Sequence, residues 1–91
     1  MKEIRKSSQF KKDFKRIKNN IALIKTLMSI VTLLEQGEAI PDEYRPHMLK
    51  GQFKGIMECH IESDCLLMWI DDRNNIVRLL RIGSHSELFG M

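Results

Sequence analysis

The residues of this sequence most suited to chemistry are three histidines and one arginine. His47, His60 and His85 all lie in the second half of the chain, and Arg81 comes shortly before His85. Histidine is the side chain best matched to proton transfer near neutral pH. Cleavage of RNA by its own 2′-hydroxyl needs a base, an acid for the leaving 5′-oxygen and a cation for the charge that develops on phosphorus. Each histidine alone is more often structural or simply exposed, so it is their clustering that favours this chemistry without a metal.

Two cysteines raise two competing interpretations, a zinc site and a cysteine nucleophile. Cys59 and His60 are consecutive in a predicted strand, so their side chains point to opposite faces and cannot bind one ion. The sequence contains neither a C-x-x-C pair nor an H-x-x-x-H spacing. A nucleophilic thiolate needs an accessible, electropositive position, whereas Cys59 is predicted to be buried and Cys65 begins an apolar strand. We therefore expect free thiols, no metal and no cofactor.

Three strands are predicted to position the candidate residues. They cover about residues 54–61, 65–71 and 76–83, with turns at 62–64 and 72–75. Connections this short require antiparallel neighbours, because a parallel pair needs a long crossover.

Alternation along the first of these strands assigns its side chains to two faces. Met57, Cys59 and Ile61 are expected against the helices, and Lys54, Glu58 and His60 on an open face that a ligand can reach. The third strand is apolar on both faces, so alternation does not decide which way Arg81 points.

Two helices are predicted before the strands. The first follows an N-cap at Ser7 or Ser8 and is amphipathic, with Phe10, Phe14 and Ile17 on one face; it ends before the Asn19-Asn20 turn. The second covers 21–36, has a wider apolar stripe and ends at Gly37. The expected fold is therefore α+β: an N-terminal helical hairpin on one face of an antiparallel sheet of three to four strands, with residues 2–6 as a candidate edge strand.

The length of 91 residues is that of one small domain, so we expect residues 1–91 to form a single unit. No apolar run approaches the roughly 20 residues needed to span a bilayer, and the N-terminus lacks the apolar stretch of a signal peptide. The sequence thus predicts a cytoplasmic protein that makes no membrane contact.

The net charge of +3 conceals an asymmetry along the chain. Residues 1–25 hold nine Lys or Arg against two acidic residues, a net of +7, whereas residues 26–91 have a net of −4. A basic first third suits a phosphate backbone or an acidic partner. It equally suits an ordinary solvated helix face.

Several stretches in combination resemble one protein family. HMLKGQFKGIMECHIESDCLLMWI at 47–70, followed by LLRIGSHSELFG at 79–90, resembles the YafQ-type branch of the RelE/ParE toxin superfamily, the toxin halves of bacterial toxin–antitoxin pairs. The shared pattern is a His-x-Leu-x-Gly connection, a Lys-Gly strand that reaches a histidine, an Asp-containing turn and an Arg-x-Gly-Ser-His-x-x-Leu-Phe ending. The helix start SQFKKDFKR at 8–16 also matches, so the similarity covers nearly the whole chain.

The resemblance implies a RelE-like fold and an endoribonuclease, or mRNA interferase, that cuts mRNA at the ribosome. It also implies neutralisation by a cognate antitoxin in a toxin–antitoxin hetero-oligomer. The residues that fall on the family's active-site positions are His47, His60, Asp64, Arg81, His85 and Phe89.

The implied roles follow these positions. His60 would be the general base, with His47 beside it and Asp64 orienting it or sharing its proton, and His85 the general acid, although the two labels are exchangeable. Arg81 would hold the scissile phosphate. Phe89 would position or stack on a base, and Lys50 and Lys54 would make secondary phosphate contacts.

Two positions depart from the family pattern. Cys65 stands where relatives commonly carry Trp, so stacking at that point is lost, and Ser63 replaces the usual Pro.

The alternative function is that of a ParE-like relative, a non-enzymatic inhibitor that binds a DNA topoisomerase. A third is a protein that only binds and sequesters an antitoxin. ParE-like members generally lack the His-rich constellation, which favours the nuclease.

Overall fold

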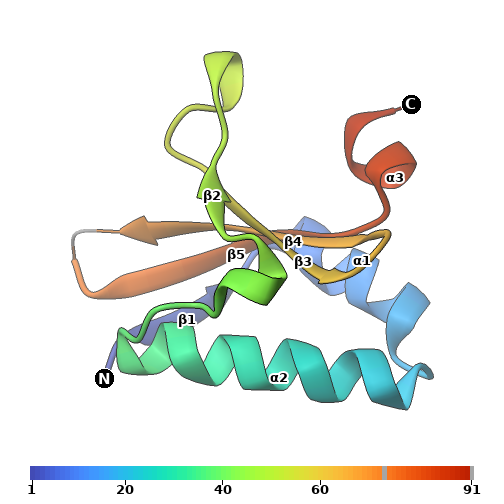
Figure 1. The fold of residues 1–91 in the computed structure, drawn as a ribbon, viewed down its shortest axis with the longest axis horizontal. Coiled ribbons are helices and arrows are strands. Elements are labelled where there is room, and N and C mark those ends of the chain that lie inside the picture. The colour runs from blue at the N-terminus through green and yellow to red at the C-terminus, as the bar shows by residue number, and fades with distance from the viewer. Residues whose placement is uncertain (73, 91) are drawn as a thin grey trace.

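The computed structural model describes residues 1–72 and 74–90, so Arg73 of the predicted turn and the terminal Met91 lie outside it. The elements in chain order are β1 (Glu3–Lys6), α1 (Ser8–Ile17), α2 (Ile21–Gln36), the 3₁₀ turn η1 (Asp42–Tyr44), β2 (His47–Met48), the 3₁₀ turn η2 (Gly51–Phe53), β3 (Met57–Glu62), β4 (Cys65–Asp72), β5 (Ile76–Gly83) and α3 (His85–Phe89). Figure 1 shows α1 and α2 on one side of the sheet, while the β2–η2 segment and α3 rise from the other side. The predicted α+β class with a helical hairpin on one face is confirmed.

Over the residues that the structure describes, the sheet has five strands in the order β1-β5-β4-β3-β2. The predicted antiparallel sheet of three to four strands is corrected, because β1 pairs parallel with β5, from Glu3 opposite Ile76 to Lys6 opposite Leu79. A parallel pair is possible here because most of the chain lies between these two strands. The extra strand β2 has two residues, too few to show an alternation in the sequence.

The first predicted strand begins three residues later than expected, at Met57 rather than at 54. Gly51 and Gly55 have φ values of 68° and 99°, a region that interrupts extended backbone and that glycine adopts without strain. The prediction that Lys54 shares a strand face with His60 is therefore wrong. Lys54 lies in the connection that follows η2.

Capping residues set the helix boundaries: Ser7 and Gly37 act as the sequence predicts, and Asn20, expected only as part of a turn, is a further cap. The Ser7 hydroxyl accepts a hydrogen bond from the Phe10 amide at 2.9 Å, which caps α1. The Asn20 side chain does the same for the Leu23 amide at 3.2 Å at the start of α2. Gly37 ends α2 in the left-handed conformation, with φ 72°.

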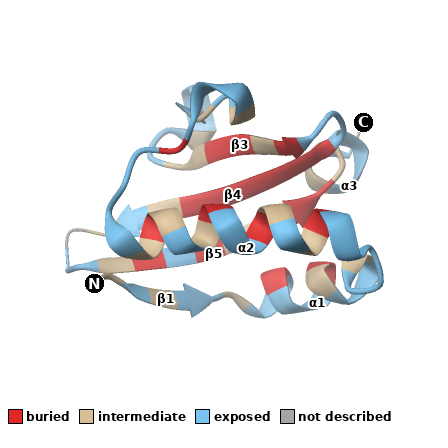
Figure 2. Cartoon of the chain, turned by 60° about the horizontal axis from the view of Figure 1, so that its bottom comes forward, coloured by how far each residue is buried: buried red, intermediate tan, exposed pale blue. Residues whose placement is uncertain are grey.

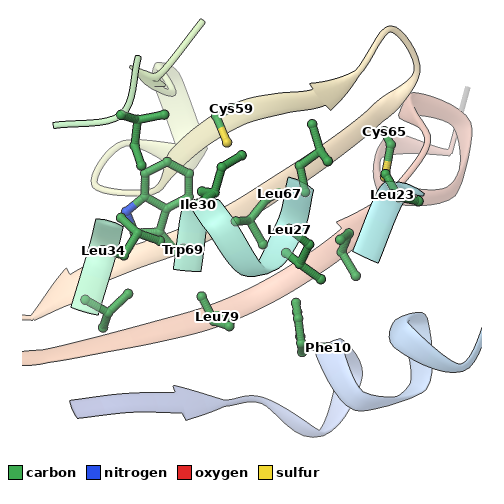
Figure 3. Packing of buried hydrophobic residues seen from close by; sticks show 14 residues of the cluster. Phe10, Leu23, Leu27, Ile30, Leu34, Cys59, Cys65, Leu67, Trp69 and Leu79 are labelled. Carbon is green, nitrogen blue, oxygen red and sulfur yellow. The ribbon is translucent and has the colours of Figure 1, made fainter. Parts of the chain in front are cut away.

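The hydrophobic core lies between the helical hairpin and the sheet (Figure 2). Figure 3 shows the side chains of this cluster converging from both layers; those labelled are Phe10, Leu23, Leu27, Ile30, Leu34, Cys59, Cys65, Leu67, Trp69 and Leu79. Each fully buried Leu, Ile or Phe contributes about 1.5–3 kcal/mol to folding. Within residues 1–72 and 74–90, no helix has the length and apolar character needed to cross a membrane.

Candidate active site

The three histidines lie together on the side of the sheet opposite the helical hairpin. His60 stands between the other two, with its ring centroid 6.3 Å from that of His47 and 6.0 Å from that of His85. The row continues through Phe89, 6.2 Å from His85, to Phe53, whose ring meets Phe89 edge-on at 5.7 Å. Residues from β2, η2, β3 and α3 thus form one row of five rings.

Strand register explains why residues distant in sequence share this face. Directly opposed residues of adjacent strands point to the same side of a sheet. One cross-strand row consists of His47, Glu58, Met68 and Arg81 in β2, β3, β4 and β5. The neighbouring row consists of His60, Leu66 and Gly83. The histidines and Arg81 are therefore carried by the same face, which settles the direction of Arg81 that alternation left open.

His85 is positioned by the start of α3, which is fixed by a capping box. The Ser84 hydroxyl accepts from the Glu87 amide, and the Glu87 carboxylate accepts from the Ser84 amide at 2.8 Å. Gly83 leaves the room this turn needs, because a Cβ there would lie 2.9 Å from Oε1 of Glu87. The short helix therefore leaves β5 in one direction and holds His85 over the sheet face.

Asp64, in the β3–β4 turn, contacts His85. Its Oδ1 accepts from the His85 amide at 3.3 Å and lies 3.4 Å from Nδ1 of the His85 ring. A carboxylate beside Nδ1 favours a proton on that nitrogen and leaves Nε2 to exchange a proton with a ligand. The resemblance paired Asp64 with His60, whereas the structure brings Asp64 to His85.

Glu58 is a site residue that the sequence analysis placed on the open face but left out of the candidate set. Its side chain is not open to ligand as expected: Glu58 is only 4% exposed, since β2 pairs beside it and His47 covers it. Oε1 of Glu58 lies 3.2 Å from Nε2 of His47, and Nδ1 of His47 donates to the Arg45 carbonyl at 2.7 Å. Oε2 of Glu58 is buried and has no hydrogen-bond partner among the described residues. A carboxylate directly before Cys59-His60 in a predicted strand gave no stronger signal in the sequence.

The surroundings of His60 change its pKa. Burial lowers the pKa of His60 from its ordinary value, the Glu58 carboxylate opposes this, and the positive charges of Arg45, His85 and His47 lower the pKa further. A lowered pKa keeps the ring neutral at neutral pH, the form that accepts a proton. A polar cavity of about 410 Å³ opens beside His60 and is bounded by η1, Arg45 and the end of β3.

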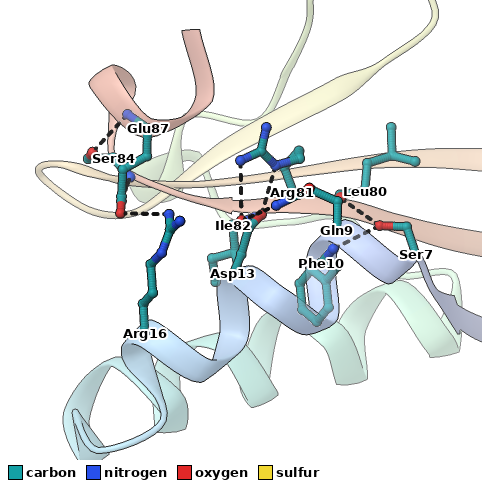
Figure 4. Close-up of polar contacts among 10 residues, drawn as sticks. All are labelled: Ser7, Gln9, Phe10, Asp13, Arg16, Leu80, Arg81, Ile82, Ser84 and Glu87. Atoms are coloured by element: carbon teal, nitrogen blue, oxygen red, sulfur yellow. Dashed lines mark hydrogen bonds and ion pairs between the residues drawn. The ribbon is translucent and has the colours of Figure 1, made fainter. Parts of the chain in front are cut away.

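Arg81 points from the shared face toward α1. Its Nε and Nη2 donate to the two carboxylate oxygens of Asp13 at 2.8 and 3.2 Å (Figure 4). Burial raises the pKa of Asp13, but hydrogen bonds from Arg81, Gln9 and the Ile82 amide outweigh this and hold the pKa below its usual value. Among residues 1–72 and 74–90, the Arg81 guanidinium forms an ion pair with Asp13 alone.

The other predicted binding residues flank the row of rings. Phe89 is half-buried at the end of α3 and is in contact with both His85 and Phe53. Lys50 and Lys54 are exposed at the two ends of η2, where their ammonium groups are free to reach a polyanion.

The thiols are separated from this site by the sheet. Burial raises the pKa of Cys59 to about 12 and that of Cys65 to about 11, which makes both poor nucleophiles. Cys59 points into the core while the adjacent His60 lies on the other face. In the described part of the chain, no three His, Cys, Asp or Glu side chains are grouped so as to hold a metal ion.

The relatives of this chain share both its fold and its length. It is 32% identical over 91 residues to the mRNA interferase toxin YafQ of Escherichia coli strain K12, covering 98% of this chain and 97% of that protein. A crystal structure of a metal-bound toxin from Helicobacter pylori superposes with a TM-score of 0.88 at 38% identity, covering 98% of this chain and all 100% of that one. A chain of the E. coli DinJ–YafQ complex superposes with a TM-score of 0.84 at 31% identity, covering 99% and 100% of the two chains.

The family match spans almost every residue. Residues 2–90 match the family described as the bacterial toxin of type II toxin–antitoxin system, YafQ. The ParE-like alternative is not favoured, because the family match, the E. coli relative and the chain of the E. coli DinJ–YafQ complex are all YafQ. The chain therefore belongs to the YafQ family of bacterial type II toxins.

Proposed function

We propose that this protein is the toxin of a type II toxin–antitoxin system and that it cleaves mRNA through the row formed by His47, His60 and His85. The observation that carries the proposal is the pairing within this row. His47 and His85 each contact a carboxylate, whereas the central His60 has a lowered pKa. A histidine with a lowered pKa between two histidines that contact carboxylates places a proton acceptor next to possible proton donors, as general acid–base cleavage requires.

The reaction is an internal attack that needs no metal. His60 takes the proton of the 2′-hydroxyl as the 2′-oxygen bonds to phosphorus, and the bond from phosphorus to the 5′-oxygen breaks. His85, with Asp64 at Nδ1, gives a proton to the leaving 5′-oxygen. The products are a 2′,3′-cyclic phosphate and a 5′-hydroxyl, so atoms and protons balance. His60 then loses the proton it gained and His85 regains the proton it gave, which restores both side chains.

The remaining residues bind the substrate. Arg81 stabilises the negative charge that develops on the phosphoryl oxygens, a role in which one positioned donor is worth about 10²–10³ in rate. Phe89 stacks on a base at the end of the row. Lys50 and Lys54 contact flanking phosphates.

The proposed substrate, mRNA, implies where the protein acts and which partners it has. One domain, residues 1–91, carries the whole activity and acts in the cytoplasm on mRNA held by the ribosome. A cognate antitoxin neutralises the protein, as the E. coli DinJ–YafQ complex supports. An apolar cavity of about 290 Å³ between α1 and α2, edged by Lys6, Lys11 and Lys15, is suited to an acidic partner and lies away from the histidines.

The test uses a defined mRNA whose cleavage sites are mapped by primer extension, with and without translating ribosomes. Purified protein should cut at codon-spaced positions with ribosomes, and a His85→Ala variant should not. A single 2′-deoxynucleotide placed on the 5′ side of a mapped cut should block that cut alone, because the nucleophile is then missing. Ser29→Ala, on the exposed face of α2, serves as the matched control and should cut normally.

Three outcomes would contradict parts of the proposal. Cleavage that survives the 2′-deoxynucleotide would exclude attack by the 2′-oxygen. Cuts on naked RNA that still require His85 would keep the site and remove the ribosome from the mechanism. Growth arrest without cleavage in either condition would exclude the nuclease.

A further inference from the structure

Asp13 is a buried charge that the row of histidines does not explain. It lies in the middle of α1 and is 1% exposed. Within the described residues, only one other charged or polar side chain in the chain, Glu58, is comparably buried, and that residue belongs to the site already described. Burying a carboxylate costs several kcal/mol unless charge pairing and hydrogen bonds compensate. A carboxylate kept in this position therefore has a specific set of partners.

Four donors surround the two oxygens of Asp13. Oδ2 accepts from Nε of Arg81 at 2.8 Å and from the Ile82 amide at 3.1 Å. Oδ1 accepts from Nη2 of Arg81 at 3.2 Å and from Nε2 of Gln9 at 3.0 Å (Figure 4). With both oxygens engaged in this way, neither the carboxylate nor the guanidinium can rotate without breaking several hydrogen bonds at once.

The same contacts close the free edge of β5. Strand β1 pairs with β5 only as far as Lys6 opposite Leu79. Beyond this point, the Ser7 amide donates to the Leu79 carbonyl and the Ser7 hydroxyl donates to the Leu80 carbonyl. The Asp13 carboxylate accepts a hydrogen bond from the Ile82 amide. Helix α1 thus replaces a strand along the part of β5 that leads directly into α3 and its histidine.

The geometry leaves one side of Arg81 available. A guanidinium offers a lateral pair of donors, Nε and one Nη, and an end pair formed by its two Nη groups. Asp13 occupies the lateral pair, and within residues 1–72 and 74–90 no other acceptor binds Nη1 or the second hydrogen of Nη2, so these donors are available to another anion. Arg81 lies in the same cross-strand row as His47 and Glu58, and its side chain is 28% exposed.

We propose that Asp13 is a positioning residue of the nuclease, which holds Arg81 so that the end pair of its guanidinium meets the scissile phosphate. This inference rests on the proposed function, since it requires Arg81 to bind the phosphate during cleavage. Asp13 itself touches neither the substrate nor the reacting atoms. It acts by fixing the cation before substrate arrives, which removes the need to order Arg81 during the reaction.

Asp13→Asn is the decisive variant because it keeps the shape of the side chain. The amide has one accepting oxygen where the carboxylate has two, so it cannot bind both lateral donors of Arg81. We expect kcat for mRNA cleavage to fall about 100-fold, the scale of a misplaced catalytic group, while KM changes little. In NMR spectra, the Nε–H signal of Arg81 should be protected from exchange in the wild type and lose this protection in the variant.

A double variant separates positioning from mere stability. In an Arg81→Ala background, Asp13→Asn should lower cleavage no further, because the residue it positions is gone. Phe10→Leu, a buried change one turn earlier in α1, is the matched control. It should lower the melting temperature without changing the rate per folded molecule.

The outcomes distinguish this inference from the proposed function. It is overturned if Asp13→Asn cuts at the wild-type rate, or lowers cleavage equally in the wild-type and Arg81→Ala backgrounds. Normal cleavage by Arg81→Ala, with His85→Ala inactive, would keep the nuclease and overturn the role of Asp13. Normal cleavage by both Arg81→Ala and His85→Ala would overturn the proposed site and this inference together.

Discussion

Neighbouring residues of β3 meet opposite environments on the two faces of the sheet. Cys59 packs into the apolar cluster beneath α2, whereas Glu58 and His60, one position to either side, face the row of rings. The same contrast recurs in β4, where Leu67 joins the helix-facing cluster and Leu66 lies between His60 and Gly83 on the other face. A single strand therefore serves stability on one side and chemistry on the other.

The contrast shows how a small protein can bury charged groups whose desolvation costs free energy. The helix-facing side is apolar throughout its cluster, and its burial supplies the folding free energy. The opposite side carries a buried carboxylate with one unpartnered oxygen, three histidines close together and an arginine tied to a second buried carboxylate. Burying charged groups costs free energy of desolvation, which the apolar burial on the other face offsets.

The largest expected effect comes from shortening Leu66 and Leu67, which are both 0% exposed. Each change to alanine should lower the free energy of unfolding by about 2–5 kcal/mol, as measured by urea denaturation. The two should differ in cleavage rate per folded molecule. Leu66→Ala opens space beneath His60 and should lower that rate, whereas Leu67→Ala should leave it unchanged. An equal loss of rate in both variants would show that the faces are not functionally separate.

The helix-facing half of this comparison could be predicted from the sequence. Apolar spacing and caps defined α1 and α2, because an amphipathic stripe and a side-chain cap are local properties of the chain. Strand alternation likewise placed Cys59 in the core. The parallel pairing of β1 could not be predicted, since it joins residues about as far apart as the chain allows and depends on no local pattern.

For the other face, the sequence indicated which histidines lie there but not which side chains contact one another. The resemblance named His47, His60 and His85, and the structure brings them together. It did not indicate that Glu58 contacts His47, or that Asp13 binds Arg81, because a two-residue strand and a helix–edge contact create these pairs. Asp13 looked like one more charge on a basic helix, and only its burial distinguishes it.

The second prediction concerns Glu58, where stability and activity should change in opposite directions. Glu58→Met keeps the volume of the side chain and removes a buried oxygen that lacks a partner. Leaving such a group unsatisfied costs about 1–3 kcal/mol, so the free energy of unfolding should rise by up to that amount. Cleavage should fall, because His47 loses the carboxylate at its Nε2. A variant that is less stable than the wild type would show that the carboxylate stabilises the fold.

The third prediction concerns pH and His60. Because the pKa of His60 lies below 6.5, its ordinary value, kcat/KM should fall only as the pH drops below that range. The folded state favours the neutral ring, so the associated stability is present above 6.5 and is lost as pH falls through the lowered pKa. Glu58→Gln removes a charge that raises the pKa of His60, so the acidic limb of the rate profile should move to lower pH. A limb that moves to higher pH would contradict the assignment of His60 as the base.

The smallest expected effect comes from the ion pair that joins α1 to α3. Arg16 and Glu87 lie 3.1 Å apart with side chains 60% and 39% exposed (Figure 4), and pairs of this kind contribute about 0.2–1 kcal/mol. Arg16→Gln should therefore change the free energy of unfolding within that range, and less so in high salt. Cleavage should stay close to the wild-type rate, since the capping box of Ser84 and Glu87 still fixes α3. Asp13 is one helical turn away on the same helix, so a loss of activity in Arg16→Gln as large as in Asp13→Asn would mean that α1 acts by docking α3 and not by holding Arg81.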